Sequence, residues 1–161
     1  MEARRTHPSD WQAIEALIRR ASRRLPRLWW WEEHLLDDLF IVTEQDGIVV
    51  GALLAWPDES PVAWTRLAVL DDGLDVGRWL DRALPPILDG LRRRGTQTLA
   101  WMDYGGWAGP HLGARDFNRL TEVMTLEKLD RVLPDTIATP ARLRLASDAD
   151  IPAVVAVDRA A

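Results

Sequence analysis

Apolar residues recur at helical spacing in two stretches of the chain. The first stretch follows Ser9 and Asp10, residue types that cap helices, and its apolar stripe consists of Trp11, Ile14, Leu17, Ile18 and Ala21. The second begins at Gly73, and its stripe consists of Val76, Trp79, Leu80, Ala83, Leu84, Ile87, Leu88 and Leu91. Each stripe occupies one side of a helix, so the pattern predicts two amphipathic helices. Pro85 and Pro86 should bend the second helix, because a proline has no backbone N–H to donate.

Between these helices, runs of β-branched and other apolar residues predict strands. Residues 39–44, 48–56 and 62–70 form three such runs. The Asp46-Gly47 pair separates the first two runs and favours a tight hairpin turn. The sequence therefore predicts an antiparallel pair of strands followed by a third strand.

Four further elements complete the predicted order. A short helix is expected within 28–36, a strand over 96–102, a short helix with Pro110 in its first turn over 107–114, and a last strand over 120–129. Strands thus come first, and strand, helix, strand, helix and strand follow. This order predicts a mixed α/β, or α+β, sheet.

The two ends of the chain resemble each other. When the sequence is shifted by 140 positions, residues 3–21 align with 143–161. Identical pairs are Arg4/Arg144, Asp10/Asp150, Ala13/Ala153, Ala16/Ala156, Arg19/Arg159 and Ala21/Ala161. The apolar positions also agree, since Trp11, Ile14 and Leu17 align with Ile151, Val154 and Val157. This long-period similarity predicts two related segments, each a short strand followed by a helix.

The repeat suggests how the chain is divided. The polar, proline-bounded stretch 134–141 has the composition of a linker. We therefore expect a domain over 1–133, a linker over 134–141, and the opening strand and helix of a second repeat over 142–161. The alternative is that 142–161 completes the first domain as an added strand and helix. The apolar residues of the last helix should dock within the chain or drive self-association.

Composition and charge narrow the classes of function. The 161 residues include no cysteine, which excludes a disulfide, a thiol nucleophile and a cysteine-ligated zinc, and is typical of a reducing, cytoplasmic setting. The three histidines share no spacing typical of a metal site, so we expect no metal. A net charge of −5 disfavours nucleic acid as a partner. There is no long apolar run for a membrane and no apolar signal core at the N-terminus.

The loop before the second long helix carries the main chemical signal. It reads Asp71-Asp72-Gly73-Leu74-Asp75-Val76-Gly77, and the free amides at a helix start bind anions. Together with the order of elements and with Asp116-Phe117 before the last predicted strand, this loop resembles the GNAT acetyltransferase superfamily over residues 3–128. The resemblance is closest to the N-terminal lobe of tandem GNAT proteins. It implies a mixed, mostly antiparallel central sheet with splayed strands and flanking helices.

The resemblance implies acetyl-CoA as co-substrate, held between the splayed strands and by the loop. The residues it places there are Leu67, Ala68, Val69, Gly73, Leu74, Asp75, Val76, Gly77 and Arg78. The family pattern R/Q-x-x-G-x-G/A falls on residues 72–77, where Asp72 replaces the basic or amide residue and Asp75 replaces the middle glycine. Asp75 is also a favourable helix cap. Two outcomes are therefore open, a loop capped by its own carboxylate or a loop that still binds CoA.

Candidate catalytic residues are few. Leu112 falls at the position of the family's usual tyrosine, which leaves Tyr104 as the tyrosine that could protonate the departing thiolate. Glu44 and Asp103 are candidates for the base that deprotonates the amine, although each also fits a strand or cap role. The resemblance implies an acyl-CoA-dependent N-acyltransferase acting on a small-molecule or peptide amine. The alternative is a catalytically degenerate lobe with a structural, docking or regulatory role, paired with a second GNAT-like domain or another copy.

Tryptophan is unusually frequent, with nine residues in 161. Trp64, Trp79 and Trp101 fall on predicted core faces. The consecutive residues 29–31 are all tryptophan and cannot share one buried face, so we expect them at a cleft rim or docking surface.

Overall fold

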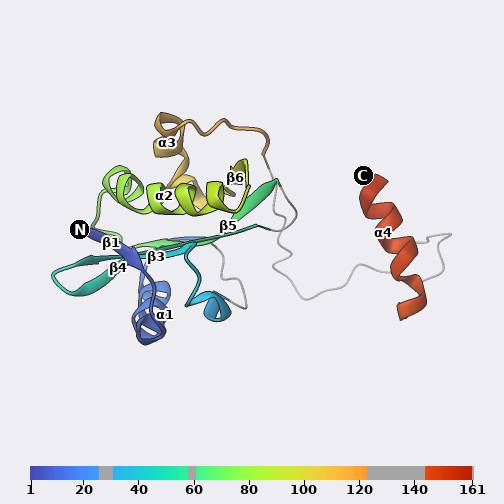
Figure 1. Cartoon of the computed structure of the whole chain (residues 1–161), viewed down its shortest axis with the longest axis horizontal. Coiled ribbons are helices and arrows are strands. Elements are labelled where there is room, and N and C mark those ends of the chain that lie inside the picture. Colours follow the sequence, from blue (N-terminus) through green and yellow to red (C-terminus); the bar gives the residue numbers. More distant parts are fainter. Residues whose placement is uncertain (26–30, 58–60, 123–143, 161) are drawn as a thin grey trace, which may run out of the picture. The chain divides into compact units, whose positions relative to one another are not determined.

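The computed structural model describes residues 1–25, 31–57, 61–122 and 144–160. The chain divides into two units, Met1–Leu120 and Thr121–Ala161. Within the described residues, the first unit contains a six-stranded sheet with helices on both faces (Figure 1).

The strands of this sheet are mostly antiparallel. β1 (Glu2–Arg5), β3 (Phe40–Gln45), β4 (Ile48–Pro57) and β5 (Val62–Leu70) lie side by side in that order, each antiparallel to its neighbour. The predicted hairpin connects β3 and β4, and Asp46 and Gly47 both adopt positive φ angles, of 54° and 77°. This geometry belongs to the tight turn that an Asp-Gly pair favours. The three central strands therefore match their sequence-based predictions closely.

The outer edge of β5 has two different partners. Because β4 pairs along one edge of β5 for nearly its whole length, any further strand must use the opposite edge. There, β6 (Thr98–Ala100) runs parallel to the first three residues of β5. Further along the same edge, β2 (Arg23–Arg24) pairs antiparallel with Val69 and Leu70. β6 therefore pairs only with the start of β5, and a segment of the chain itself lies along the end of that edge.

Two long helices cover opposite faces of the sheet (Figure 1). α1 (Trp11–Arg20) buries Ile14, Leu17 and Ile18, as its apolar stripe predicts. Trp11 is an exception, since it is the first residue of the helix and remains 42% exposed. A short 3₁₀ turn precedes α1, and its capping box is formed by His7 and Asp10.

α2 (Val76–Arg93) covers the other face and continues through Pro85 and Pro86 as one helix. Its apolar stripe is buried except for the partly exposed Leu88. The basic residues at its end pair with carboxylates of this chain, since Arg92 contacts Asp89 while Arg93 and Arg94 contact Asp37 and Asp38. These contacts support a structural role for this cluster of arginines.

The shorter elements differ more from expectation. The predicted strand over 96–102 is reduced to β6, and the predicted helix over 107–114 is split into α3 (Gly109–Leu112) and a 3₁₀ turn over Gly113–Arg115. Residues 31–34 form a 3₁₀ turn, while 28–30 lie outside the described residues. Residues 120–122 are not in a strand. The rest of the expected last strand and the expected linker also lie outside the described residues.

Two tryptophans contradict their predicted environments. Trp31 is buried and contacts the Phe40 ring edge-on at a centroid distance of 6.0 Å, so it belongs to the core and not to a rim. Trp64 is 36% exposed, because the two faces of β5 alternate and its side chain lies on the partly open one. Trp79 is fully buried, as predicted. Trp29 and Trp30 lie outside the described residues.

The described part of the second unit consists of a 3₁₀ turn (Asp148–Asp150) followed by α4 (Ile151–Ala160). Residues 144–147 precede the turn and are not in a strand. None of the helices in the described parts of the chain has both the length and the apolar content of a membrane span.

Candidate functional site

The loop between β5 and α2 is capped by its own side chain. Asp75 occupies the N-cap position of α2 with an extended backbone, and its Oδ1 accepts a hydrogen bond of 2.7 Å from the N–H of Arg78. A carboxylate in this place satisfies one of the donors that a helix start otherwise offers to an anion. The expected cap at Asp75 is therefore present.

The first turn of α2 retains two free backbone donors beside this cap. Within the described residues, the N–H groups of Val76 and Gly77 have no hydrogen-bond partner, whereas the N–H of Leu74 donates to Asp71 O at 3.1 Å. These two N–H groups lie in the first turn of α2, where the helix dipole favours negative charge. The loop thus combines part of an anion site with a carboxylate that competes for it.

Asp72 connects the loop to the segment that carries β2. Its Oδ1 accepts hydrogen bonds from the backbone N–H and the hydroxyl of Ser22, both at 2.9 Å, and from the N–H of Arg23 at 3.3 Å. The Ser22 hydroxyl in particular lowers the pKa of Asp72 below its ordinary value of 3.8. In return, Arg23 Nη1 donates to Leu74 O at 2.6 Å. The residue that replaces a basic position in the family pattern therefore holds two parts of this chain together.

A third carboxylate of the loop is also engaged internally. Arg20 at the end of α1 donates from Nε to Asp71 Oδ2 at 3.0 Å, and its Nη2 donates to Val49 O at 3.3 Å. Asp71, Asp72 and Asp75 thus each bind a group of this chain. The acidic loop has an internal structural explanation that needs no metal ion, and no group of metal-binding side chains occurs in the described residues.

The outer edge of β5 is partly covered where the resemblance places acetyl-CoA. Leu67, Ala68 and Val69 are almost completely buried. The N–H of Leu25 donates to Ala68 O at 2.8 Å, immediately beyond the pairing of β2 with the end of β5. A ligand that binds residues 68–70 at this edge through backbone hydrogen bonds would have to displace residues 23–25.

Arg115 joins the start of α2 to the segment after α3. It donates to Gly77 O at 2.7 Å, to His111 O at 2.6 Å and to Asp81 Oδ1 at 2.9 Å. Gly77 packs closely here, because a side-chain carbon at this position would lie 3.4 Å from both Arg115 Nη2 and His111 Nδ1. Sequence reasoning missed Arg115, since a single arginine in a short irregular segment has no periodic signal.

The candidate catalytic residues do not form one group. Glu44 lies on β3 and contacts the guanidinium of Arg4, so β4 separates it from the outer edge of β5. Asp103 follows β6, and its carboxylate accepts hydrogen bonds from the N–H groups of Ala108 at 3.1 Å and Gly109 at 2.7 Å. Tyr104 is 38% exposed, and its hydroxyl lies 3.9 Å from the sulfur of Met102. Asp103 and Tyr104 are thus adjacent in the chain after β6, whereas Glu44 lies on another strand.

Aromatic side chains pack between α2 and the chain that follows β6. Trp107 lies 5.8 Å from Trp79 and 6.3 Å from Trp101, measured between ring centroids, and Trp101 also lies 6.5 Å from Phe117. These rings join the core cluster on the α2 face of the sheet, which also contains Leu112. The position that corresponds to the family's tyrosine is therefore a buried aliphatic residue.

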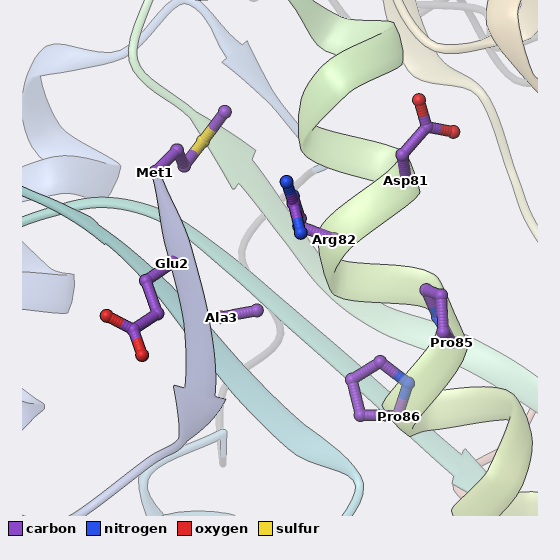
Figure 2. Close-up of a pocket in the computed structure, with 7 residues that line it drawn as sticks. All are labelled: Met1, Glu2, Ala3, Asp81, Arg82, Pro85 and Pro86. Atoms are coloured by element: carbon purple, nitrogen blue, oxygen red, sulfur yellow. The ribbon is translucent and has the colours of Figure 1, made fainter.

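A groove of about 500 Å³ lies elsewhere, between β1 and α2. It is lined by Met1, Glu2, Ala3, Asp81, Arg82, Pro85 and Pro86. Figure 2 shows Arg82 extending from α2 toward β1, whereas Asp81 points away from it. Because β1 and β6 lie on opposite sides of the β3–β4–β5 strands, this groove is distant from the outer edge of β5. It contains none of the predicted site residues.

This chain is similar to solved N-acetyltransferase structures. N-acetylglutamate synthase from Neisseria gonorrhoeae, complexed with coenzyme A and N-acetyl-glutamate, matches with a TM-score of 0.62 and 23% identity, over 74% of this chain and 28% of that chain. The aminoglycoside N-acetyltransferase AAC(6')-Iy in complex with CoA matches with a TM-score of 0.57 and 17% identity, over 79% of this chain and 98% of that chain. Ribosomal-protein-alanine N-acetyltransferase from Brucella melitensis gives a TM-score of 0.54 and 20% identity, over 71% and 82%.

These similarities define the class of fold. The chain has the GNAT acetyltransferase fold, in which a mixed, mostly antiparallel sheet is flanked by helices. It spans 28% of the N-acetylglutamate synthase chain but nearly all of the AAC(6')-Iy chain. No family model matches the sequence, and the comparison with curated proteins gave no match.

Proposed function

We propose that this chain is a GNAT-fold lobe of an acyl-CoA-dependent N-acyltransferase, and that the lobe itself is catalytically degenerate and acts in structure or docking. The fold supports the first part, because the neighbours named above are N-acetyltransferases, two of them complexed with CoA. In this class of reaction an amine attacks the thioester carbonyl, an amide bond forms, and the sulfur of CoA leaves as a thiol. The single observation that carries the second part is the pairing of β2 with the outer edge of β5.

The pairing matters because a strand edge has one set of backbone donors and acceptors. Acetyl-CoA placed along Leu67, Ala68 and Val69, as the resemblance implies, would have to direct its own amide groups at the N–H and C=O groups at the end of β5. In this chain Val69 and Leu70 already pair with Arg23 and Arg24, and Ala68 O accepts from Leu25. CoA binding on this edge would therefore require residues 23–25 to leave it, together with the loss of their hydrogen bonds.

Charge opposes a pyrophosphate at the same place. Asp75 bonds the N–H of Arg78, and Asp71 and Asp72 add two carboxylates in the preceding turn. Like charges at short range repel, although solvent and salt reduce the effect at an exposed loop. The loop therefore favours the chain's own groups over an external anion.

The candidate catalytic groups are engaged in structure. The Asp103 carboxylate binds two N–H groups at the start of α3, and Glu44 binds Arg4. A base must be within hydrogen-bond reach of the proton it removes. These contacts support a lobe whose polar residues maintain its own fold.

Isothermal titration of acetyl-CoA tests the proposal. We expect no saturable binding by the unmodified chain, and a gain of binding by the double variant Asp72→Arg/Asp75→Gly, which restores the family pattern and releases β2 from the loop. The matched control is Asp89→Arg/Asp148→Gly, which changes the net charge by the same amount away from the loop. It should bind no more than the unmodified chain.

Each result has a definite meaning. Micromolar binding by the unmodified chain overturns the degenerate assignment and supports a working acyltransferase. Binding by neither protein, with both folded by circular dichroism, contradicts the expected gain and shows that the loop carboxylates alone do not exclude acetyl-CoA. In that case Leu25→Pro, which removes the donor to Ala68, should open the edge.

One observation favours a second candidate, an active transferase in which β2 is displaced by the cofactor. The N–H groups of Val76 and Gly77 have no partner within the described residues, and β2 contains only two residues. Release of free thiol from acetyl-CoA in the presence of a panel of primary amines tests this activity. Amine-dependent thiol release that rises in Asp75→Ser, which keeps a helix-capping side chain but removes the competing negative charge, would support it.

A further inference from the structure

We infer that residues 144–160 open a second GNAT-type unit of the same protein, and that the sheet of this unit, formed by the polypeptide that continues after α4, covers the apolar side of α4. This arrangement does not depend on whether the first unit binds acyl-CoA. Its support comes from features that the described part of the second unit shares with β1 and α1 of the first.

An arginine and an aspartate form the same bidentate pair in both units. In the first unit, Arg4 Nη1 and Nη2 donate to the two carboxylate oxygens of Asp10, each at 2.8 Å. In the second, Arg144 Nη1 donates to Asp150 Oδ2 at 2.7 Å and its Nη2 donates to Oδ1. Each arginine also donates to the carbonyl of the next residue, at 2.9 Å and 3.1 Å respectively. The two residue pairs are separated by 140 positions, as in the sequence repeat.

The start of the helix is also repeated. Asp10 accepts a 2.7 Å hydrogen bond from the N–H of His7, and Asp150 accepts a 2.8 Å bond from the N–H of Ser147. Both contacts belong to capping boxes on a three-residue 3₁₀ turn that leads directly into a helix of ten residues. Two alanine-rich helices can match in sequence by chance. A bidentate arginine–aspartate pair combined with a capping box at the start of the helix is a more specific similarity.

The two helices differ in how far their equivalent apolar residues are buried. Ile14 and Leu17 of α1 are completely buried, in one cluster with residues of β3, β4 and β5. The equivalent residues of α4, Val154 and Val157, are 61% and 71% exposed. Since α4 presents aliphatic residues at the positions where α1 contacts a sheet, the partner that fits it is a sheet face of the same kind.

A comparison of Arg144 with Arg4 indicates where the first strand of that sheet would lie. Arg4 Nη2 contacts a second carboxylate, that of Glu44 on β3, and the Arg4 side chain is 38% exposed. Arg144 has Asp150 as its carboxylate partner within the described residues, and its side chain is 65% exposed. A strand placed beside Arg144, as β3 lies beside β1, would cover this side chain and could supply the second carboxylate.

A second copy of this chain is a poorer partner. The sheet face that would receive α4 is already covered by α1, whose Ile14 and Leu17 have no exposed surface. Another copy could bind there only if α1 left its own sheet. A sheet formed by the polypeptide after α4 would not require α1 to leave its own sheet. It therefore fits α4 better than a second copy does.

Hydrogen–deuterium exchange on two proteins tests the inference: the 161-residue chain and the natural gene product extended past residue 161 by the length of the first unit. We expect the amides of 151–160 to exchange at least ten times faster than those of α1 in the shorter chain. In the extended protein they should be protected to the level of α1. Val154→Lys/Val157→Lys should remove this protection.

Ala156→Lys is the matched control, because the equivalent Ala16 lies on the exposed side of α1. It should leave the protection of α4 unchanged. The inference is overturned if the gene has no such continuation, if α4 stays unprotected in the extended protein, or if the valine variant protects as well as the control. A dimer of the shorter chain in light scattering that the valine variant abolishes would assign the face to a second copy and would also overturn it. Acetyl-CoA titration is not involved, so failure here leaves the proposed function untouched.

Discussion

Several aspartates of the first unit each accept hydrogen bonds from specific donors. Asp10 is one of them, and its side chain is largely buried, with 8% exposed. It joins β1 to the start of α1 through Arg4 and through the N–H of His7. Asp150 repeats these contacts in the second unit, through Arg144 and the N–H of Ser147. The two aspartates are therefore a natural pair for comparison.

Asp10→Ala should lower the free energy of unfolding of the first unit by about 2 kcal/mol at pH 7, because it removes charge-assisted hydrogen bonds and leaves a partly buried guanidinium without them. Arg4 lowers the pKa of Asp10 below its ordinary value of 3.8. The stabilisation is therefore present above pH 3.8 and is lost as the pH falls through the lower folded-state pKa. Urea unfolding at pH 7 and pH 3 measures both effects. Asp150→Ala should leave the first unit unchanged, and an equal loss in both variants would contradict the assignment.

Gly51 should tolerate no side chain. A β-carbon at this position would lie 2.4 Å from Thr43 Oγ1 and 2.6 Å from Trp79 Nε1, both in the core. Gly51→Ala should therefore destabilise the first unit by about 1–3 kcal/mol through overpacking. Chemical unfolding monitored by tryptophan fluorescence provides the measurement. Gly113→Ala is the control, because nothing lies within 4 Å of that position, and a similar loss there would refute the steric explanation.

Among the elements, β2 is the shortest strand of the sheet, and a carboxylate of the loop before α2 binds the residues at its start. It is two residues long, and Asp72 holds the segment immediately before it through Ser22. A strand this short has little pairing of its own to oppose local opening. Hydrogen exchange at the amides beside β2 should therefore respond to changes in the loop between β5 and α2.

Asp72→Asn should increase the exchange rate of the Leu25 amide, which donates to Ala68 O, by several-fold at neutral pH. The pKa of Asp72 is lowered by the Ser22 hydroxyl and by backbone N–H groups, so the ionised form holds β2 above pH 3.8 and the contact weakens as the pH falls below that value. Amide exchange by NMR, corrected for the intrinsic pH dependence, should show wild type and variant converging in acid. Asp46→Asn in the β3–β4 turn serves as the control. An unchanged Leu25 rate in Asp72→Asn would show that β2 does not depend on this carboxylate.

Long elements are easier to predict from the sequence than short ones. β4, β5, α1 and α2 are predicted within a few residues, because runs of nine to eighteen residues carry a clear period. β2 is missed, since two residues have no period and their partner lies more than forty positions away. The cap at Asp75 is predictable because it is a local contact over three residues. Its neighbour Asp72 binds Ser22, fifty positions earlier, which local reasoning cannot find.

At the scale of the whole molecule, the sheet separates two hydrophobic clusters. One lies under α1 and includes Ile14, and the other lies under α2 and includes Ile87. The order of elements predicts a mixed α/β or α+β sheet, and its GNAT class follows only when the loop before α2 and Asp116-Phe117 are added to the comparison. The site is less predictable, because the acidic loop resembles a cofactor loop in position while its side chains bind the chain itself.

Ile14→Val and Ile87→Val should each destabilise the first unit by about 0.5–1.5 kcal/mol, and the double variant should lose the sum of the two within about 0.5 kcal/mol. The reason is that the two fully buried side chains share no cluster. Urea unfolding of the three variants gives the coupling energy. A control pair within one cluster, Leu84→Ala and Ile87→Val, should depart from additivity, and strong coupling between Ile14 and Ile87 would contradict two separate packing regions.

The short β2 strand also has an evolutionary consequence. The closure of the β5 edge involves the loop carboxylate of Asp72 and four residues from Ser22 to Leu25, and of these four only Leu25 belongs to the apolar clusters under α1 and α2. A lineage could therefore gain or lose ligand binding in this lobe through a handful of codon changes without rebuilding its core. Orthologues with a basic residue at position 72 and glycine at position 75 would mark the ancestral or regained state, and their distribution would date the closure.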